Sequence, residues 1–255
     1  MSVRDFREFT AQELKDFRMA GRTLAELFRD LREQVHAGVT GRQVDAWVEK
    51  EIIARGAKVS YKSPDVNFPG AICISPNDVV VHGVPKDEPF EVGDVVGFDL
   101  VIEVGGMKAD SAFTMVVDEE PKGAKKMLLS ATERSLYAGI DAIHGAVRTG
   151  DIGAAVESVL SAAKLGIVRD LVGHGIGREM HEDPDVPNFG RAGSGVLVPV
   201  GAAIAIEPMA TLGGWKVVQD DPDGWSIRTR DGSLSAHFEH TVLITPDGVE
   251  IITKL

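Results

Sequence analysis

The sequence contains very little cysteine, since Cys73 is the only one in 255 residues. A lone cysteine excludes an internal disulfide and a cysteine-rich zinc site. Basic residues are also scarce, with 27 Lys and Arg against 39 Asp and Glu, which gives a net charge of −12. Because proteins bind nucleic acids mainly through Lys and Arg on phosphates, this balance argues against a nucleic acid as partner or substrate.

Long apolar runs are missing as well. No stretch approaches the about 18–20 consecutive apolar residues that cross a membrane. Residues 1–9 lack the apolar centre of a secretory signal. With 44% hydrophobic and 26% charged residues, the composition is that of an ordinary globular chain. We therefore expect a cytoplasmic protein without a membrane partner.

Two helices are predicted near the N-terminus. Thr10 and Glu13 have the spacing of a capping box, and apolar residues at helical spacing then continue up to Gly38. Thr40 and Gln43 can cap a second helix, which Gly56 ends. Its apolar positions are Val44, Val48 and Ile52.

A similar pattern recurs 108 residues later. Between residues 28 and 54, six residues are identical to those at this offset, among them His36 and His144. The pattern predicts a duplicated helix–helix–strand unit with a site between the two halves. The alternative is two amphipathic helix pairs that are alike in composition only. We expect one catalytic domain over 1–255, with a tail at 1–9 and halves at about 10–118 and 119–255.

The remaining segments have strand periodicity. Residues 95–104 and 109–117 alternate and flank Gly105-Gly106, which is typical of a hairpin turn. Further strands are expected at 203–206, 215–218, 225–229, 238–245 and 249–253. The fold class is therefore α+β, with helices packed on a largely antiparallel sheet.

The hairpin register brings two carboxylates together. If Val104 pairs with Met107, Asp99 lies opposite Ala112. Asp99 and Asp110 then share one face as diagonal neighbours, with Cβ atoms on the order of 7 Å apart. Two such carboxylates on a half-buried sheet repel each other unless a cation lies between them. The alternative is a pair of solvated aspartates on an outer face.

Two glutamates and a histidine extend this set. Glu207 and Glu239 lie in apolar strands without Lys or Arg nearby, and an unpaired buried charge is costly. His174 lies among glycines, where a structural histidine is the simpler reading. Four carboxylates would balance two divalent cations. One imidazole with four carboxylates suits Mn²⁺, Fe²⁺ or Co²⁺.

Several continuous stretches resemble the methionine aminopeptidases, dinuclear-metal enzymes of the pita-bread fold with an internal pseudo-twofold. The most specific stretches are 72–85, 173–177, 206–209 and 233–241. The resemblance is to the short type I form. It implies removal of the initiator methionine from the N-termini of nascent polypeptides. It also implies two divalent ions (cobalt, manganese, iron, zinc or nickel) and a monovalent cation (sodium or potassium).

The resemblance assigns roles to individual residues. Asp99 would chelate one metal, and His174 with Glu207 the other, while Asp110 and Glu239 would bridge both. Glu207 would also move the proton of the attacking water. The same resemblance places His82 and His181 beside the scissile peptide. It gives the monovalent cation the carbonyls of Asn77, Val79 and Ser235, and the methionine pocket the side chains of Phe68, Cys73, Met180 and Trp225.

One stretch departs from the family pattern. Residues 61–69 are shortened before Phe68, so one aromatic residue of the pocket is missing or replaced. Met180 stands where an aromatic residue is common, and a thioether there is adaptable. We expect Cys73 to be a buried, inert thiol because its surroundings are apolar.

Two other functions stay open. One is an aminopeptidase of the same fold that cleaves before proline, although such proteins commonly carry an additional N-terminal domain and Thr10 already begins the first helix here. The other is a non-catalytic pita-bread protein, although such proteins lose metal ligands. We also expect a monomer, with the ribosome as a candidate partner.

Overall fold

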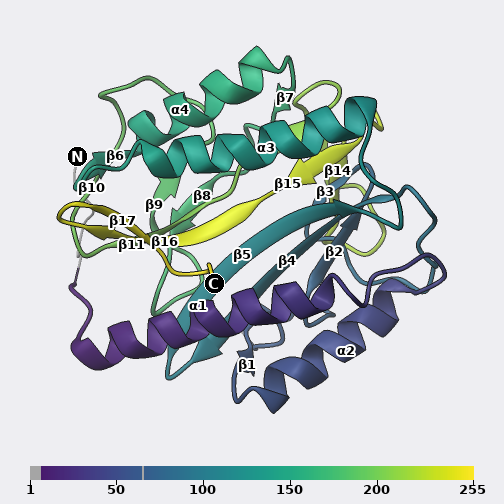
Figure 1. Cartoon of the computed structure of the whole chain (residues 1–255), viewed down its shortest axis with the longest axis horizontal. Helices are drawn as coiled ribbons and strands as arrows, with labels where there is room; N and C mark the ends of the chain where they lie inside the picture. Colours follow the sequence, from purple (N-terminus) through teal and green to yellow (C-terminus); the bar gives the residue numbers. More distant parts are fainter. Residues whose placement is uncertain (1–6, 65) are drawn as a thin grey trace.

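The computed structural model describes residues 7–64 and 66–255 (Figure 1). Residues 1–6 of the expected tail and Asp65 of the shortened stretch therefore lie outside the described residues. The helices are α1 (Ala11–Leu31), α2 (Gly41–Ala54), α3 (Gly123–Asp141) and α4 (Thr149–Ala162). In Figure 1 the α1–α2 pair and the α3–α4 pair lie on opposite sides of the long central strands.

Both predicted capping boxes are present. The Thr10 hydroxyl accepts from the Glu13 backbone N–H, and the Glu13 carboxylate accepts from the Thr10 N–H. Thr40 and Gln43 make the same reciprocal pair. Helix α1 ends at Leu31, earlier than the apolar pattern indicated. The Glu33 and Gln34 N–H groups donate to carbonyls only three residues earlier, those of Asp30 and Leu31, so α-helical bonding does not continue.

The strands are β1 (Lys58–Val59), β2 (Cys73–Pro76), β3 (Val79–Val81), β4 (Val95–Val104), β5 (Met107–Val116), β6 (Val147–Arg148), β7 (Gly166–Ile167), β8 (Gly173–Gly175), β9 (Glu182–Val186), β10 (Leu197–Val198), β11 (Ala203–Ile206), β12 (Met209–Thr211), β13 (Val217–Val218), β14 (Ile227–Thr229), β15 (Ser235–His237), β16 (Glu239–Thr245) and β17 (Gly248–Ile251). Nine of them form the main sheet, in the order β1-β4-β5-β16-β11-β8-β9, with β2 on β4 and β17 on β16. Every strand pair is antiparallel, as expected.

The offset of 108 residues relates the elements of the two halves. Helix α2 begins at residue 41 and α4 at 149, and strand β1 begins at residue 58 and β7 at 166. Both differences are 108, so the helix–strand unit recurs with the spacing that the sequence pattern indicated. Figure 1 shows the two helix pairs in related positions about the central strands.

The β4–β5 hairpin has the predicted register. Val104 pairs with Met107 and Asp99 with Ala112, although β5 starts at Met107, two residues before the predicted strand. Gly105 and Gly106 both adopt positive φ, at 58° and 86°, as a two-residue turn of type I′ requires. The turn therefore fixes which side chains share each face.

One face of the hairpin belongs to the main core. Phe98, Leu100 and Ile102 are fully buried there against residues of the helices, such as Leu24 and Leu27 of α1. Since side chains alternate along a strand, the residues between them point to the opposite face. Asp99 lies on that opposite face.

Strand β11 has the predicted bounds, whereas two other C-terminal strands start later than predicted. Strand β13 starts at Val217 and β14 at Ile227, each two residues later than the apolar pattern indicated. The reason for β14 is local, because one oxygen of the Asp223 carboxylate accepts from the backbone N–H groups of both Trp225 and Ser226. These donors are turned away from any strand partner. No helix in the described part of the chain has the length and apolar character needed to span a bilayer.

Candidate metal centre and substrate pocket

Five adjacent strands carry the five expected metal ligands. Strands β4, β5, β16, β11 and β8 follow one another in the sheet, and they carry or immediately precede Asp99, Asp110, Glu239, Glu207 and His174, respectively. In sequence the first and last of these residues are 140 positions apart. The sheet order brings them to one place, and both halves of the chain contribute.

The register aligns the ligands across the sheet. Ala112 of β5 pairs with Asp99 on one side and with Glu239 on the other. The Asp110 N–H donates to the Thr241 hydroxyl, which in turn donates to the Asp110 carbonyl. Both backbone groups of Asp110 are thereby satisfied, and its side chain is directed toward Glu239.

The side chains converge on a small volume. Asp110, His174 and Glu239 each place one ligand atom within 4.8 Å of the others. The His174 Nε2 atom lies 3.7 Å from Asp110 Oδ2 and 3.7 Å from Glu207 Oε1. The structure therefore brings Glu207 into the same cluster. Asp99 lies one strand away from Asp110 in the paired hairpin.

His174 is oriented for ligand binding by its own strand. Its Nδ1 lies 2.9 Å from the Gly175 carbonyl oxygen, which can only accept, so Nδ1 carries the proton and Nε2 has a free lone pair. A Cβ on Gly173 would clash with the Ala205 carbonyl, and one on Gly175 with the Asp183 carbonyl. The glycines around His174 therefore serve close strand packing.

The carboxylates are strongly perturbed. Burial raises the pKa of Asp110 well above its ordinary value, and the charges of Asp99 and Glu207 raise it further. Burial likewise raises the pKa of Glu239 and of Glu207, with added repulsion from the neighbouring carboxylates. Burial lowers the pKa of His174 to about 4. The protein alone does not supply the positive charge that this cluster of acids requires.

The residues fit a divalent-metal site. Asp110 Oδ1 is buried without a hydrogen-bond partner. Within residues 7–64 and 66–255, neither Glu207 nor Glu239 has a Lys or Arg within 4.0 Å. Buried carboxylates of this kind are stabilised by a shared cation. An oxygen-rich set with one imidazole suits metals of the Mn²⁺, Fe²⁺ and Co²⁺ type.

Three further histidines surround this cluster. The ring of His181 lies 4.3 Å from that of His174, measured between centroids. His82 follows β3 with a φ of 57°, an uncommon conformation for a residue with a side chain, and burial lowers its pKa to about 4. His237 was not among the predicted site residues, yet its Nε2 lies buried 3.3 Å from Glu207 Oε2.

The expected pocket residues form one apolar cluster, which we call the pocket cluster. Its buried members are Tyr61, Phe68, Cys73, Val101 and Met180, with Val66, Val84 and Trp225 packed against them. Phe68 meets Trp225 edge to face at 5.3 Å. Burial raises the pKa of the Cys73 thiol well above its ordinary value, in agreement with the predicted inert cysteine.

Tyr61 of the shortened stretch contributes an aromatic ring to the pocket cluster. Its ring meets Phe68 at 5.6 Å between centroids, inside the pocket cluster. The sequence left open whether a pocket aromatic residue is missing or replaced, and the Tyr61 ring beside Phe68 is compatible with a replacement. A tyrosine seven residues before Phe68 gave no local signal, because only the folded loop brings the two together.

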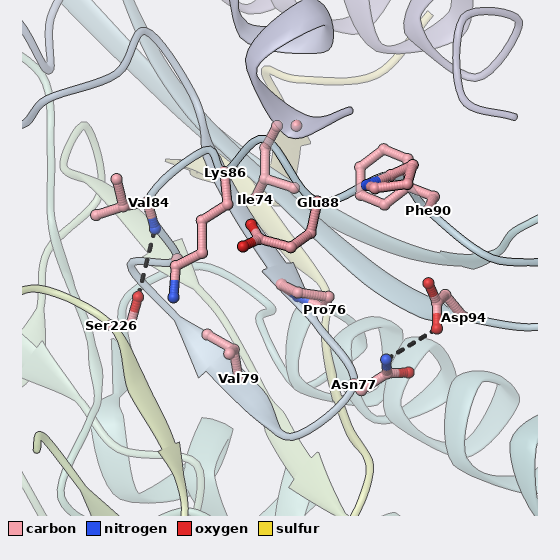
Figure 2. A pocket seen from close by; sticks show the side chains of 13 residues that line it. Ile74, Pro76, Asn77, Val79, Val84, Lys86, Glu88, Phe90, Asp94 and Ser226 are labelled. Atoms are coloured by element: carbon pink, nitrogen blue, oxygen red, sulfur yellow. Dashed lines mark hydrogen bonds between the residues drawn. The ribbon is translucent and has the colours of Figure 1, made fainter. Parts of the chain in front are cut away.

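The three residues expected at a monovalent cation also meet. The Ser235 hydroxyl lies 3.2 Å from the Asn77 carbonyl oxygen and 3.0 Å from that of Val79. A cavity of about 390 Å³ lies beside this segment (Figure 2). Asn77 and Val79 line the cavity, and none of the five expected divalent-metal ligands does. Figure 2 shows Lys86 and Glu88 pointing into it.

Comparison with known proteins gives the family. A model of metallopeptidase family M24 matches residues 15–246, so the chain belongs to this family. The chain is 41% identical over 243 residues to a methionine aminopeptidase of Clostridium perfringens, covering 95% of this chain and 96% of that protein. It is 35% identical over 246 residues to methionine aminopeptidase 1 of Bacillus subtilis, covering 96% and 98%. The resemblance in the sequence motifs is confirmed.

Solved structures confirm the fold. The methionine aminopeptidase of Thermotoga maritima superimposes with a TM-score of 0.93 at 38% identity, covering 98% of this chain and 99% of that one. Prolidase from Pyrococcus furiosus shares the fold with a TM-score of 0.75 at 20% identity, covering 97% and 65%. The prediction of an α+β pita-bread fold is therefore correct.

Proposed function

We propose that this M24 metallopeptidase removes the initiator methionine from the N-termini of nascent proteins and peptides. The observation that carries the proposal is the position of the pocket cluster next to the candidate metal centre. Cys73 of the cluster pairs directly with Asp99 of the centre across β2 and β4. A substrate whose first side chain is bound in the pocket cluster would therefore have its first peptide bond near the carboxylates. The similarity to methionine aminopeptidases supports the same substrate.

The proposed centre holds two divalent ions. Asp99 would hold one ion and His174 with Glu207 the other, while Asp110 and Glu239 would be ligands shared by both. Four carboxylates then balance two 2+ charges, which would relieve the repulsion recorded in the raised pKa values. Such ions, when bound, polarise a carbonyl and make water more acidic. The identity of the metal among cobalt, manganese, iron, zinc and nickel is decided by elemental analysis.

Three side chains carry the proposed proton and charge chemistry. Glu207 would be ionised beside bound divalent ions, and its carboxylate would accept the proton of the attacking water and pass it to the leaving amine. His82 and His181 donate hydrogen bonds to the oxygen on which negative charge develops. His82 is uncharged near neutrality, since burial lowers its pKa to about 4. A neutral imidazole still offers one N–H for this purpose.

Methionine selection is assigned to Phe68, Cys73, Met180 and Trp225 of the pocket cluster. His82 and His181 are proposed as further contacts of the substrate. An unbranched thioether side chain suits an aromatic-lined apolar cluster, because sulfur makes favourable contacts with ring edges. Asn77, Val79 and Ser235 are proposed to bind sodium or potassium through their carbonyls.

A peptide panel tests the proposed activity. The purified protein, incubated with divalent metal, is expected to release methionine from Met-Ala-Ser and to leave Leu-Ala-Ser and Ala-Pro-Ser intact. Cleavage of Ala-Pro-Ser alone would establish the competing Xaa-Pro aminopeptidase. Failure to cleave any peptide and to bind metal would indicate a non-catalytic binding protein.

Removal of either His82 or His181 is expected to slow the reaction. His181→Ala and His82→Ala should each lower kcat by about 10²–10³-fold, the usual cost of losing a donor to a developing oxyanion. Metal content, measured by elemental analysis, should stay near that of the wild type. His144→Ala removes an exposed histidine and is the matched control. Unchanged kcat in both site variants would contradict the assigned role.

The remaining proposals concern context. Because both halves, at about 10–118 and 119–255, contribute ligands, we propose that they form one catalytic domain. We propose that the enzyme acts in the cytoplasm, where nascent chains emerge from the ribosome. We also propose that it is a monomer. Co-sedimentation with ribosomes, compared at low and high salt, tests the partner. Light scattering of the purified protein tests the monomer.

A further inference from the structure

Tyr61 connects the two parts of the site. Its hydroxyl donates a hydrogen bond of 2.6 Å to Asp99 Oδ1, and both side chains are buried. Its ring belongs to the pocket cluster and meets Phe68 edge to face. One side chain therefore contacts a proposed metal ligand at its polar end and the proposed methionine pocket along its ring.

The surrounding strands fix this position. Strand β1 pairs with β4 at Glu103 and Ile102, and the Ser60 N–H continues the ladder to the Val101 carbonyl. Tyr61 follows at once and so lies beside Asp99 of the same strand. The shortened loop closes when the Phe68 N–H donates to the Tyr61 carbonyl at 3.0 Å. The loop therefore holds both aromatic residues by their backbones.

We propose that Tyr61 is a positioning residue that orients Asp99 for metal binding and ties that ligand to the methionine pocket. The inference rests on the proposed function, since it assigns a role within the same site. It adds a residue that the motif comparison did not assign.

The physical argument starts from the two oxygens of Asp99. With Oδ1 held by the phenol, rotation of the carboxylate is restricted and Oδ2 keeps one direction. In the described part of the chain, no Lys or Arg lies within 4.0 Å of Asp99 to compete for this role. Partners that orient a metal ligand in this way typically contribute about 10–100-fold in metal affinity. The hydroxyl, and not the ring, is therefore the group to remove.

The first experiment compares Tyr61→Phe with Tyr137→Phe. The chain has only two tyrosines, so the second variant is a matched loss of one hydroxyl. Tyr137 lies on helix α3, and its hydroxyl is 3.3 Å from His240 Nε2. Metal-free protein is titrated with Co²⁺ in a calorimeter, and the visible spectrum of bound Co²⁺ is recorded, because it reports ligand geometry.

The expected result is specific to one site. Tyr61→Phe should bind one of two Co²⁺ equivalents about 10–100-fold more weakly, with an altered spectrum, while Tyr137→Phe behaves as wild type. At saturating metal the KM for a methionyl peptide should stay near wild type, because the ring is kept, whereas kcat falls at limiting metal. Wild-type affinity and spectrum in Tyr61→Phe would overturn the proposal.

A second measurement covers the case that Tyr61→Phe does not fold. Protein labelled with 3-fluorotyrosine has two fluorine resonances, which Tyr137→Phe assigns. Added metal should shift the Tyr61 resonance and leave the other in place, and an unshifted Tyr61 resonance would contradict the proposal. Failure of the wild-type protein to release methionine would instead contradict the proposed function. The calorimetric and the fluorine titrations with metal would still test the role of Tyr61.

Discussion

Asp110→Asn is expected to reduce methionine release by at least about 10³-fold, because the proposed bridging ligand loses its charge while its shape is kept. Elemental analysis should find less than two metal ions per chain. Asp87→Asn is the matched control, since Asp87 is an exposed aspartate that pairs with Arg42 at the surface. Wild-type turnover in Asp110→Asn would remove the basis of the proposed centre.

The same substitution is expected to stabilise the folded state of the metal-free protein. Asp110 is buried beside Asp99 and Glu207, which raise its pKa together with burial. Replacing its carboxyl with an amide removes one member of this repelling group. We therefore expect metal-free Asp110→Asn to unfold at a higher denaturant concentration than metal-free wild type near pH 8. Equal midpoints would show that the carboxylates do not repel in the folded state.

Removal of metal is expected to make stability strongly dependent on pH. Bound metal present at about 1,000 times its Kd adds about 4 kcal/mol to the free energy of unfolding for each site. Without metal, the raised pKa values of Asp110, Glu207 and Glu239 mean that the folded chain holds protons that the unfolded chain has released. Stability is then lost as the pH rises, by about 1.4 kcal/mol per pH unit for each proton held.

The buried histidines have the opposite effect on stability, because their pKa values are lowered and not raised. Burial lowers the pKa of His82 and His174 to about 4, so their contribution grows as the pH rises from 4 toward 6.5 and is then constant. Between about pH 7 and pH 8 these two histidines no longer change the balance, and the metal-loaded protein is the reference for other titrating groups such as His36. Denaturant unfolding of metal-free and metal-loaded protein at these two pH values measures it. A metal-free protein as stable at pH 8 as at pH 7 would contradict the prediction.

The parts of the fold that could be predicted from the sequence depend on local rules. Thr10 with Glu13, and Gly105 with Gly106, determine a helix start and a hairpin register within a few residues. From that register alone Asp99 and Asp110 share a face. The convergence of Glu207, Glu239 and His174 follows from no local rule; the cost of burying unpaired charge and the motif resemblance predict it.

The parts that the sequence did not reveal depend on distant contacts. Tyr61 looked like one end of a shortened loop, and only the pairing of β1 with β4 places its hydroxyl on Asp99. His237 lies two residues before Glu239 in a run that resembles an apolar strand. Its contact with Glu207 forms only in the folded protein, because Glu207 follows a different strand, β11. The late start of β14 follows from the Asp223 side chain, which a periodicity pattern does not register.

The position of β16 has a consequence for how the molecule is made. This strand lies between β5 and β11, and its residue Glu239 pairs with Ala112, 127 positions earlier. Contacts so distant along the chain form late, because a long loop must close first. During synthesis, the hairpin with Asp99 and Asp110 leaves the ribosome long before its partners. Asp99 and Asp110 therefore cannot be joined by Glu239 until β16, the last strand but one, has been translated.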